Sequence, residues 1–113
     1  MSGDNVLLKI VSIILEPPSS ERVVKAFSII REMIKLDTAV SIYLLGDGIY
    51  CGIKGINLEI INSDNLQVFA NKEDLEARGI REDLLSKKVK CQNNSLEKMI
   101  VDIMEQADRI LCF

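Results

Sequence analysis

The sequence predicts an α/β fold in which a mostly parallel, five-stranded sheet carries helices on both faces, giving three layers. Short segments rich in Val, Ile and Leu alternate along the chain with segments whose apolar residues recur at helical spacing. Alternation of this kind produces βαβ units with right-handed crossovers and a largely parallel sheet. With 113 residues, 48% of them hydrophobic, the chain fits a single domain spanning residues 1–113.

The first strand and the first helix come from the N-terminal third of the chain. Residues 6–15 contain β-branched residues and leucine without clean alternation, which is typical of a central strand buried on both faces. The proline pair at 17–18 ends this segment, and one of the serines at 19–20 can cap the helix that follows. Apolar residues at helical spacing extend that helix to about Lys35.

Two further strands lie on either side of a glycine-containing turn. Residues 38–45 form a second apolar segment that ends at a Gly-Asp-Gly turn at 46–48, whose glycines tolerate positive φ. A short helix or turn is expected over residues 49–54. Residues 56–65 fit neither a strand nor a helix clearly, and residues 66–70 form a short, buried third strand.

The second half of the chain continues the alternation. Asn71 is a favoured N-cap for the next helix, Asp74 is spaced to reach back to the backbone N–H of that cap, and Gly79 supplies a left-handed stop. Residues 88–91 form the fourth strand candidate, and Ser95 is expected to cap the last helix.

The last helix and the last strand complete the predicted sheet. Residues 109–113 form the fifth strand, and Cys112 inside it is expected to pack in the core. One face of the preceding helix is expected to carry core residues, namely Leu96, Met99, Ile100, Ile103 and Met104.

Composition excludes several classes of function. The net charge is −3, and Lys and Arg are scattered apart from a small group at 87–90, so direct binding of nucleic acid is not expected. The chain has no histidine and its three cysteines form no CxxC, so the usual zinc sets and the Ser-His-Asp and Cys-His pairs are absent. No metal, cofactor or membrane segment is expected, and the widely spaced cysteines without a signal-like N-terminus indicate the cytoplasm.

Four segments, taken in order, resemble the DsrE/DsrF/DsrH-like family, whose members include the Tus proteins that relay sulfur for tRNA 2-thiolation. These are LLKIVSIILEPPSSERVVKAFSI, SIYLLGDGIYCGIKG, LQVFANKEDLEARGI and EQADRILCF. The most specific pieces are the Gly-Asp-Gly-apolar turn at 46–49 and the VFA-x8-RG segment at 68–79. The resemblance covers nearly the whole chain and implies the same α/β fold.

The resemblance also identifies a missing thiol. Sulfur-carrying members of the family have a persulfide cysteine eight positions before the glycine of the RG pair, and this chain has Asn71 there, eight positions before Gly79. The start of a helix suits such a cysteine, because unpaired N–H groups and the helix dipole favour the thiolate. DsrH/TusB-like members also lack this cysteine, whereas the long first strand and helix are more similar to the DsrE branch, so the subfamily stays open.

The loops after the first, second and third strands are the candidate site, because ligands of parallel sheets bind beyond the carboxyl ends of strands. The residues expected to form a pocket or bind a partner are Gly46, Asp47, Gly48, Cys51, Asn71 and Lys72. Cys51 and Cys91 are the weak candidates for a catalytic thiol.

Three functions follow as hypotheses. The first is a non-carrier, partner-binding subunit of a sulfur-relay or sulfur-metabolism assembly, without stand-alone enzyme activity. The resemblance implies related DsrE/DsrF-like subunits or further copies of this chain as its partners, in dimers, trimers or hexamers. The second is a persulfide sulfurtransferase with a relocated thiol at Cys51 or Cys91. The third is a small-molecule-binding module on the same fold.

Overall fold

The computed structural model describes residues 8–55, 58, 61 and 63–113, and it confirms the predicted α/β fold. One sheet contains five strands in the order β4-β3-β2-β1-β5, and every strand pairing in it is parallel. The strands are β1 (Lys9–Ile14), β2 (Ala39–Leu44), β3 (Leu66–Asn71), β4 (Val89–Gln92) and β5 (Arg109–Cys112). The first two positions of the strand predicted at 6–15, and much of the ambiguous segment 56–65, lie outside the described residues.

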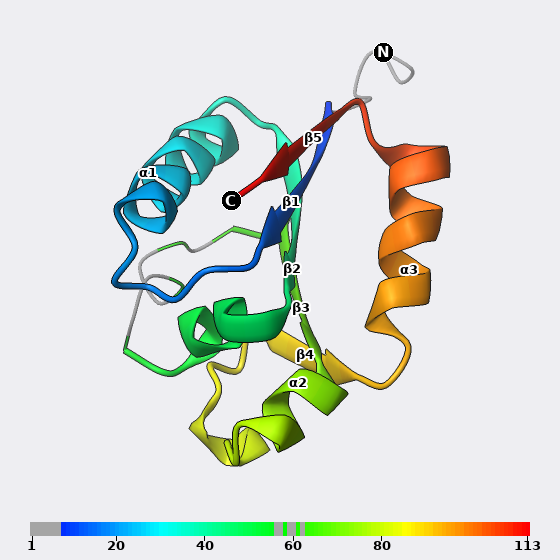
Figure 1. The fold of residues 1–113 in the computed structure, drawn as a ribbon. Coiled ribbons are helices and arrows are strands. Elements are labelled where there is room, and N and C mark those ends of the chain that lie inside the picture. Colours follow the sequence, from blue (N-terminus) through cyan, green and yellow to red (C-terminus); the bar gives the residue numbers. More distant parts are fainter. Residues whose placement is uncertain (1–7, 56–57, 59–60, 62) are drawn as a thin grey trace.

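Helices cover both faces of the sheet and one of its ends (Figure 1). α1 (Glu21–Lys35) lies against one face, and α3 (Ser95–Val101) lies against the other and continues into a π-helical turn, Asp102–Gln106. α2 (Lys72–Ala77) and the 3₁₀ helix Gly46–Gly52 lie at the end towards which the strands point. The three predicted layers are therefore present.

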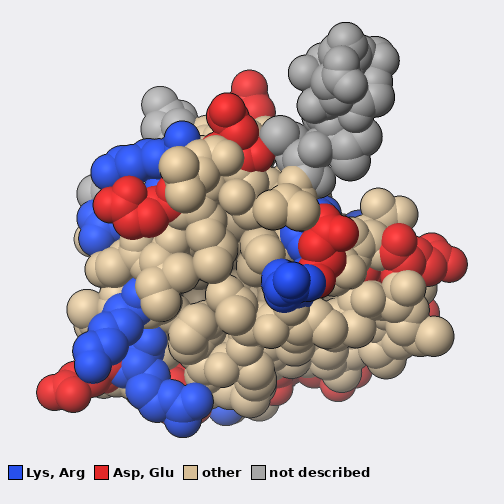
Figure 2. Space-filling model, turned by 90° about the horizontal axis from the view of Figure 1, so that it is seen from above, with Lys and Arg blue, Asp and Glu red and all other residues tan. Residues whose placement is uncertain are grey.

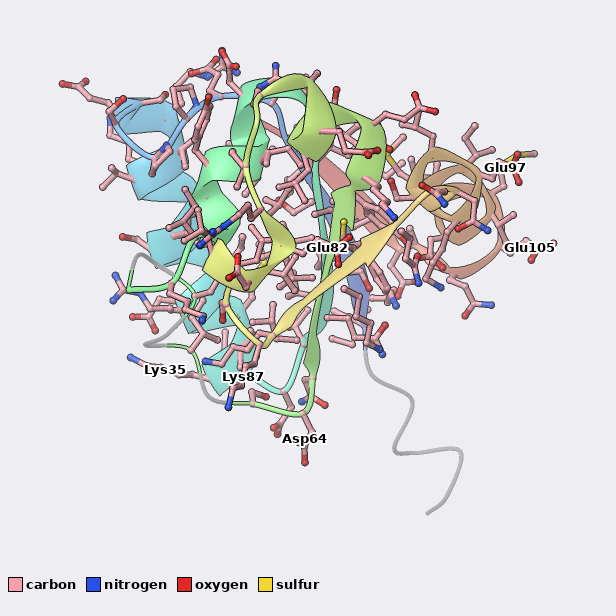
Figure 3. All side chains as sticks on the ribbon, turned by 90° about the horizontal axis from the view of Figure 1, so that it is seen from below. Lys35, Asp64, Glu82, Lys87, Glu97 and Glu105 are labelled. Atoms are coloured by element: carbon pink, nitrogen blue, oxygen red, sulfur yellow. The ribbon has the colours of Figure 1, made fainter. Side chains whose placement is uncertain are left out.

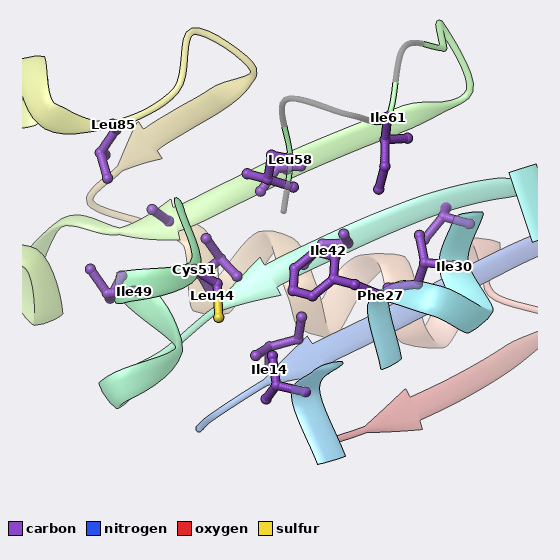
Figure 4. Close-up of a cluster of buried hydrophobic side chains, with 14 of the residues drawn as sticks. Ile14, Phe27, Ile30, Ile42, Leu44, Ile49, Cys51, Leu58, Ile61 and Leu85 are labelled. Atoms are coloured by element: carbon purple, nitrogen blue, oxygen red, sulfur yellow. The ribbon is translucent and has the colours of Figure 1, made fainter. Parts of the chain in front are cut away.

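Each face of the sheet has its own apolar core, because successive side chains of a strand point to opposite faces. The larger core joins β1, β2 and β3 to α1 and to the 3₁₀ helix Gly46–Gly52, and Figure 4 shows Leu44 of β2 beside Ile49 and Cys51. The smaller core lies under α3. It consists of Val11, Tyr43 and Phe69, with Met99 and Ile103 packed against them.

A buried polar pair fixes α3 on its face of the sheet. The Tyr43 hydroxyl donates a hydrogen bond to the Asp102 carboxylate, and the Tyr43 ring stacks on Phe69 with 5.0 Å between the ring centroids. Burial raises the pKa of Tyr43 well above its ordinary value, and the hydrogen bond and the negative charge of Asp102 raise it further. The neutral phenol is therefore the form that the fold stabilises.

Two expectations about α3 are wrong. Its N-cap is Asn94, so Ser95 already lies in the helix, where its hydroxyl oxygen is buried without a hydrogen-bond partner. Of the five apolar residues expected on its core face, Leu96, Ile100 and Met104 are exposed. The physical reason is that the bond between Asp102 and Tyr43 turns a different side of the helix towards the sheet.

Two further expectations need correction. Cys112 is exposed and does not pack in the core, because β5 is the edge strand of the sheet. The short helix expected from residue 49 begins at Gly46, so the Gly-Asp-Gly sequence forms the first turn of the helix and not a separate turn before it. The left-handed conformation expected at Gly79 is confirmed by its φ of +66°.

Replacing Tyr43 by Phe should lower the free energy of unfolding by about 1 to 3 kcal/mol near neutral pH, because the buried Asp102 carboxylate loses its donor. A raised folded pKa means that the stability contributed by the neutral Tyr43 is complete below its unfolded value of 10.0 and is lost as the pH rises above it. Urea unfolding measured across this range should show a steeper loss above pH 10 in the wild type than in Tyr43→Phe.

Tyr50→Phe is the matched control, because no hydrogen bond of the Tyr50 hydroxyl is found among the described residues. Equal stability and equal pH dependence of the two phenylalanine variants would contradict the anchoring role of Tyr43.

Candidate functional site

The carboxyl ends of β1, β2 and β3 bring three loops to one end of the molecule. Residues 15–20 follow β1, the 3₁₀ helix Gly46–Gly52 follows β2, and α2 begins directly after Asn71 at the end of β3. Figure 1 shows α2 and this 3₁₀ helix side by side below the sheet. This is the edge at which parallel sheets of α/β proteins place their ligands.

Arg78 joins the two helical segments at this edge. Its Nε donates to Asp47 Oδ1 at 3.0 Å, its Nη2 lies 3.0 Å from the same oxygen, and its Nη1 donates to the backbone oxygen of Asp74 at 3.1 Å. Nη1 is also 3.7 Å from Asp74 Oδ1, the i,i+4 contact that the sequence allows. One partly buried guanidinium therefore connects α2 to the loop after β2.

Asp74 completes the connection from the other direction. Its Oδ2 accepts a hydrogen bond from the backbone N–H of Gly46 at 2.9 Å and another from Asn71 Nδ2 at 3.0 Å. The expected bond from Asp74 back to the backbone N–H of Asn71 is replaced by these two, because the loop after β2 presents its own unpaired N–H to the carboxylate. The link between Gly46 and Asp74 spans 28 residues, which spacing within one helix cannot predict.

Asn71 occupies the N-cap position of α2, as predicted, but its side chain makes no capping hydrogen bond. It is 6% exposed and its amide nitrogen is committed to Asp74. An amide at this position cannot carry sulfane sulfur. Its structural role is to hold the Asp74 carboxylate where it meets Gly46 and Arg78.

The two glycines at 46 and 48 are required by the local geometry. Gly46 has a φ of +54°, a conformation that costs a side-chain-bearing residue about 1 to 2 kcal/mol. A Cβ on Gly48 would lie 1.9 Å from the backbone oxygen of Ile14, so the 3₁₀ helix can pack against the end of β1 only with glycine there. Both glycines serve the packing of the loop, and Gly48 itself is buried.

Cys51 points into the core from the same 3₁₀ helix. It is fully buried, and its Sγ lies 3.6 Å from the backbone oxygen of Glu16. Burial raises the pKa of the Cys51 thiol to about 12, so the reactive thiolate is scarce at neutral pH. Figure 4 shows it between apolar side chains of the larger core, which disfavours Cys51 as a relocated carrier.

Cys91 lies on β4, paired in register with Ala70 and one residue before the partner of Asn71. It is partly buried, and burial raises the pKa of its thiol. The negative charge of Glu82 raises that pKa further, whereas Lys72 lowers it. Lys72 was also predicted for the site, but its ammonium pairs with Glu82, at 3.8 Å from Oε1, and does not take part in the contacts that Asn71 makes with Asp74.

The structure thus brings together Gly46, Asp47 and Asn71 of the predicted site, through Asp74 and Arg78. The sequence did not reveal the bond between Arg78 and Asp47. Within the described residues, no group of three or more His, Cys, Asp or Glu side chains could hold a metal ion. Every helix in that part of the chain is too short or too polar to cross a membrane.

A domain with this topology and this carboxyl edge belongs to the class of small α/β proteins with one parallel sheet. A family model described as "DsrH like protein" matches residues 24–110. The chain therefore belongs to the DsrH-like family, whose proteins are part of sulfur-relay complexes. No curated protein matches the chain at a significant level.

Solved structures confirm the fold. MTH1491 of Methanobacterium thermoautotrophicum, a protein of unknown function, superimposes with a TM-score of 0.77 at 17% identity, covering 92% of this chain and 98% of its own. The ychN protein of E. coli superimposes with a TM-score of 0.75 at 19% identity, and the match covers 96% of this chain and 100% of the ychN chain. Tm0979 of Thermotoga maritima superimposes with a TM-score of 0.53 at 17% identity, and the match covers 86% of this chain and 95% of the Tm0979 chain.

Arg78→Ala should lower the free energy of unfolding by about 1 to 2 kcal/mol, because Asp47 and the carbonyl of Asp74 lose their shared donor. Arg31→Ala is the control, since the one hydrogen bond of its side chain within the described residues is to the Ser28 hydroxyl on the exposed side of α1, and its effect should stay within about 0.5 kcal/mol. Urea denaturation measures both. A cost no larger than that of the control would mean that the guanidinium does not hold the carboxyl edge together.

Proposed function

We propose that the chain is a non-carrier subunit of an intracellular sulfur-relay assembly, and that it acts by binding related DsrE/DsrF-like subunits or further copies of itself. Membership of the DsrH-like family supports the assembly. The observation that carries the proposal is the apolar outer surface of α3. A role in tRNA thiolation is the corresponding expectation for the pathway.

The outer side of α3 is apolar although it faces solvent in the single chain. Four large apolar side chains there are between 46% and 79% exposed, and we call them the α3 surface: Leu96, Ile100, Val101 and Met104. The inner side of the same helix is apolar too, with Met99 and Ile103 in the smaller core. Glu97 and Glu105 also project from this helix (Figure 3), but a group of large exposed apolar side chains on one helix is the feature that marks a protein interface.

The chemistry at the carboxyl edge favours binding over sulfur transfer. The family position of the persulfide cysteine holds Asn71, and Cys51 is buried with a raised pKa. A partner's cysteine-bearing segment would meet a rigid edge, because Arg78 and Asp74 hold the residues at 46–47 in place. This agrees with a subunit that positions a reactive thiol supplied by another chain.

The charge distribution also favours a protein partner over nucleic acid. On the face that Figure 2 shows, an area without Lys, Arg, Asp or Glu lies between the charged side chains at the left margin and a mixed group of basic and acidic side chains nearer the middle. The net charge of −3 opposes binding to phosphate backbones. The three free cysteines suit a reducing compartment, in keeping with a cytoplasmic location.

Ile100→Glu should weaken assembly at least about tenfold, because a charge would be buried at the centre of the α3 surface. Val24→Glu on α1 is the matched control, since Val24 is exposed to the same extent but lies on the opposite face of the sheet. Light scattering after size-exclusion chromatography would measure self-association. Titration with DsrE/DsrF-like subunits from the same genome would measure binding between different chains.

Loss of assembly in Ile100→Glu alone supports the proposal. Equal assembly of both variants would contradict the α3 surface as the interface. A wild-type chain that stays monomeric and binds no such subunit would contradict the function itself.

The intact mass of the protein distinguishes a non-carrier subunit from a sulfurtransferase, which would gain the mass of a sulfur atom. After incubation with a persulfide donor, the wild type should show no stable increment of one sulfur atom, because Asn71 cannot carry it and Cys51 is buried. A cysteine-bearing relative loaded in the same assay is the control for the donor. A stable increment that disappears in Cys91→Ser, but not in Cys112→Ser, would make this protein a carrier with a relocated thiol.

A further inference from the structure

Two adjoining cavities lie beside the edge strand β4, on the face of the sheet that carries α1. Their volumes are about 300 and 320 Å³, and both are lined by Lys54, Ser86 and Lys87. The first continues along β4 past Leu85 and Val89, which belong to the larger core, to Cys91. Figure 3 shows Lys87 near the start of β4 and Glu82 farther along, beside the same strand. A volume of this size suits a small molecule.

The shared end of the two cavities carries an excess of positive charge. Among the described residues, Lys54 and Lys87 form no ion pair. The Lys88 ammonium is already committed to the backbone oxygens of Leu58, at 2.6 Å, and of Ile61.

The two acidic residues that line the first cavity each have a basic neighbour. Glu82 lies 3.8 Å from the Lys72 ammonium, and Asp83 lies 3.2 Å from Arg81 Nε. Within the described part of the chain, Lys54 and Lys87 are therefore the two cations of that cavity that have no carboxylate partner.

A buried hydroxyl lines both cavities together with these two lysines. Ser86 is 2% exposed, its backbone N–H is bonded to the Gly52 oxygen at 2.7 Å, and its Oγ accepts the N–H of Lys88 at 3.3 Å. Within the described residues its own hydroxyl proton has no acceptor. A buried donor without an acceptor, in the wall of a cavity flanked by two lysines, matches the oxygen atoms of an anionic group.

We propose that this cavity binds a small organic anion, with a carboxylate or phosphate group held by Lys54, Lys87 and the Ser86 hydroxyl. The apolar part of the ligand lies along Leu85 and Val89 towards Cys91. This site is distinct from the α3 surface, which is on the opposite face of the sheet. It can therefore be present or absent whatever the outcome of the assembly experiments.

Selective alkylation tests the site, because Cys91 reports on the cavity and the exposed Cys112 reports on solvent. Mildly alkaline protein is treated with iodoacetamide, with or without octanoate, whose apolar chain is long enough to extend from the two lysines towards Cys91, and modification of each cysteine is followed by peptide mass spectrometry. Octanoate should slow the modification of Cys91 at least about fivefold, the effect of occupying roughly four fifths of the sites, and should leave Cys112 unaffected.

The double variant Lys54→Gln/Lys87→Gln should lose this protection, and Lys35→Gln on the exposed end of α1 should keep it. Equal slowing of Cys91 and Cys112 in the wild type, or protection that survives in the double variant, would overturn the proposal.

Competition identifies the anionic group. Octanoate is compared with octyl phosphate, which carries a phosphate group on the same apolar chain. Stronger protection of Cys91 by octyl phosphate indicates a phosphate-bearing ligand, and stronger protection by octanoate indicates a carboxylate. An unchanged Cys91 rate with both anions, at concentrations that leave Cys112 unaffected, would contradict an anion site in this cavity.

Discussion

The arrangement of the carboxyl edge depends on the guanidinium of Arg78. It links Asp47 in the loop after β2 to Asp74 in the helix after β3, and the same aspartate binds the backbone of Gly46 and the side chain of Asn71. Parallel strands end at a common edge, but their loops are joined only if side chains meet across them. The family motifs around Gly46 and Gly79 are therefore the two halves of one hydrogen-bonded unit.

Asn71 belongs to this unit through its hydrogen bond to Asp74. The thiol of Cys51 is buried, whereas the apolar side chains of the α3 surface are exposed in the single chain. The bond between Tyr43 and Asp102 contributes to that surface, because it helps to set the rotation of α3 on the sheet. A polar contact in the core thus influences which apolar side chains of α3 face solvent.

The sequence predicted the elements well, for identifiable reasons. Strands buried on both faces are marked by continuous apolar segments, Asn71 does occupy the N-cap position of α2, and Gly79 does adopt the left-handed conformation. The wrong predictions concern the surroundings of single residues: Ser95 lies inside its helix and does not cap it, and Met104 is exposed to solvent and does not pack in the core. The same holds at the site: the sequence selected Gly46, Asp47 and Asn71, whereas the pairing of Asp47 with Arg78, 31 residues away, depends on how the loops pack.

Local patterns in the sequence determined the strand and helix order, the parallel sheet and the absence of histidine chemistry, because these depend on residue type and short-range spacing. Tertiary structure decided which thiols are buried, which side of α3 meets the sheet and where a cavity opens beside β4. Each of these depends on contacts between residues far apart in the chain. Cys51 is buried because the loop that carries it folds against β1 and β2, and Cys112 is exposed because its strand has a neighbour on one side only.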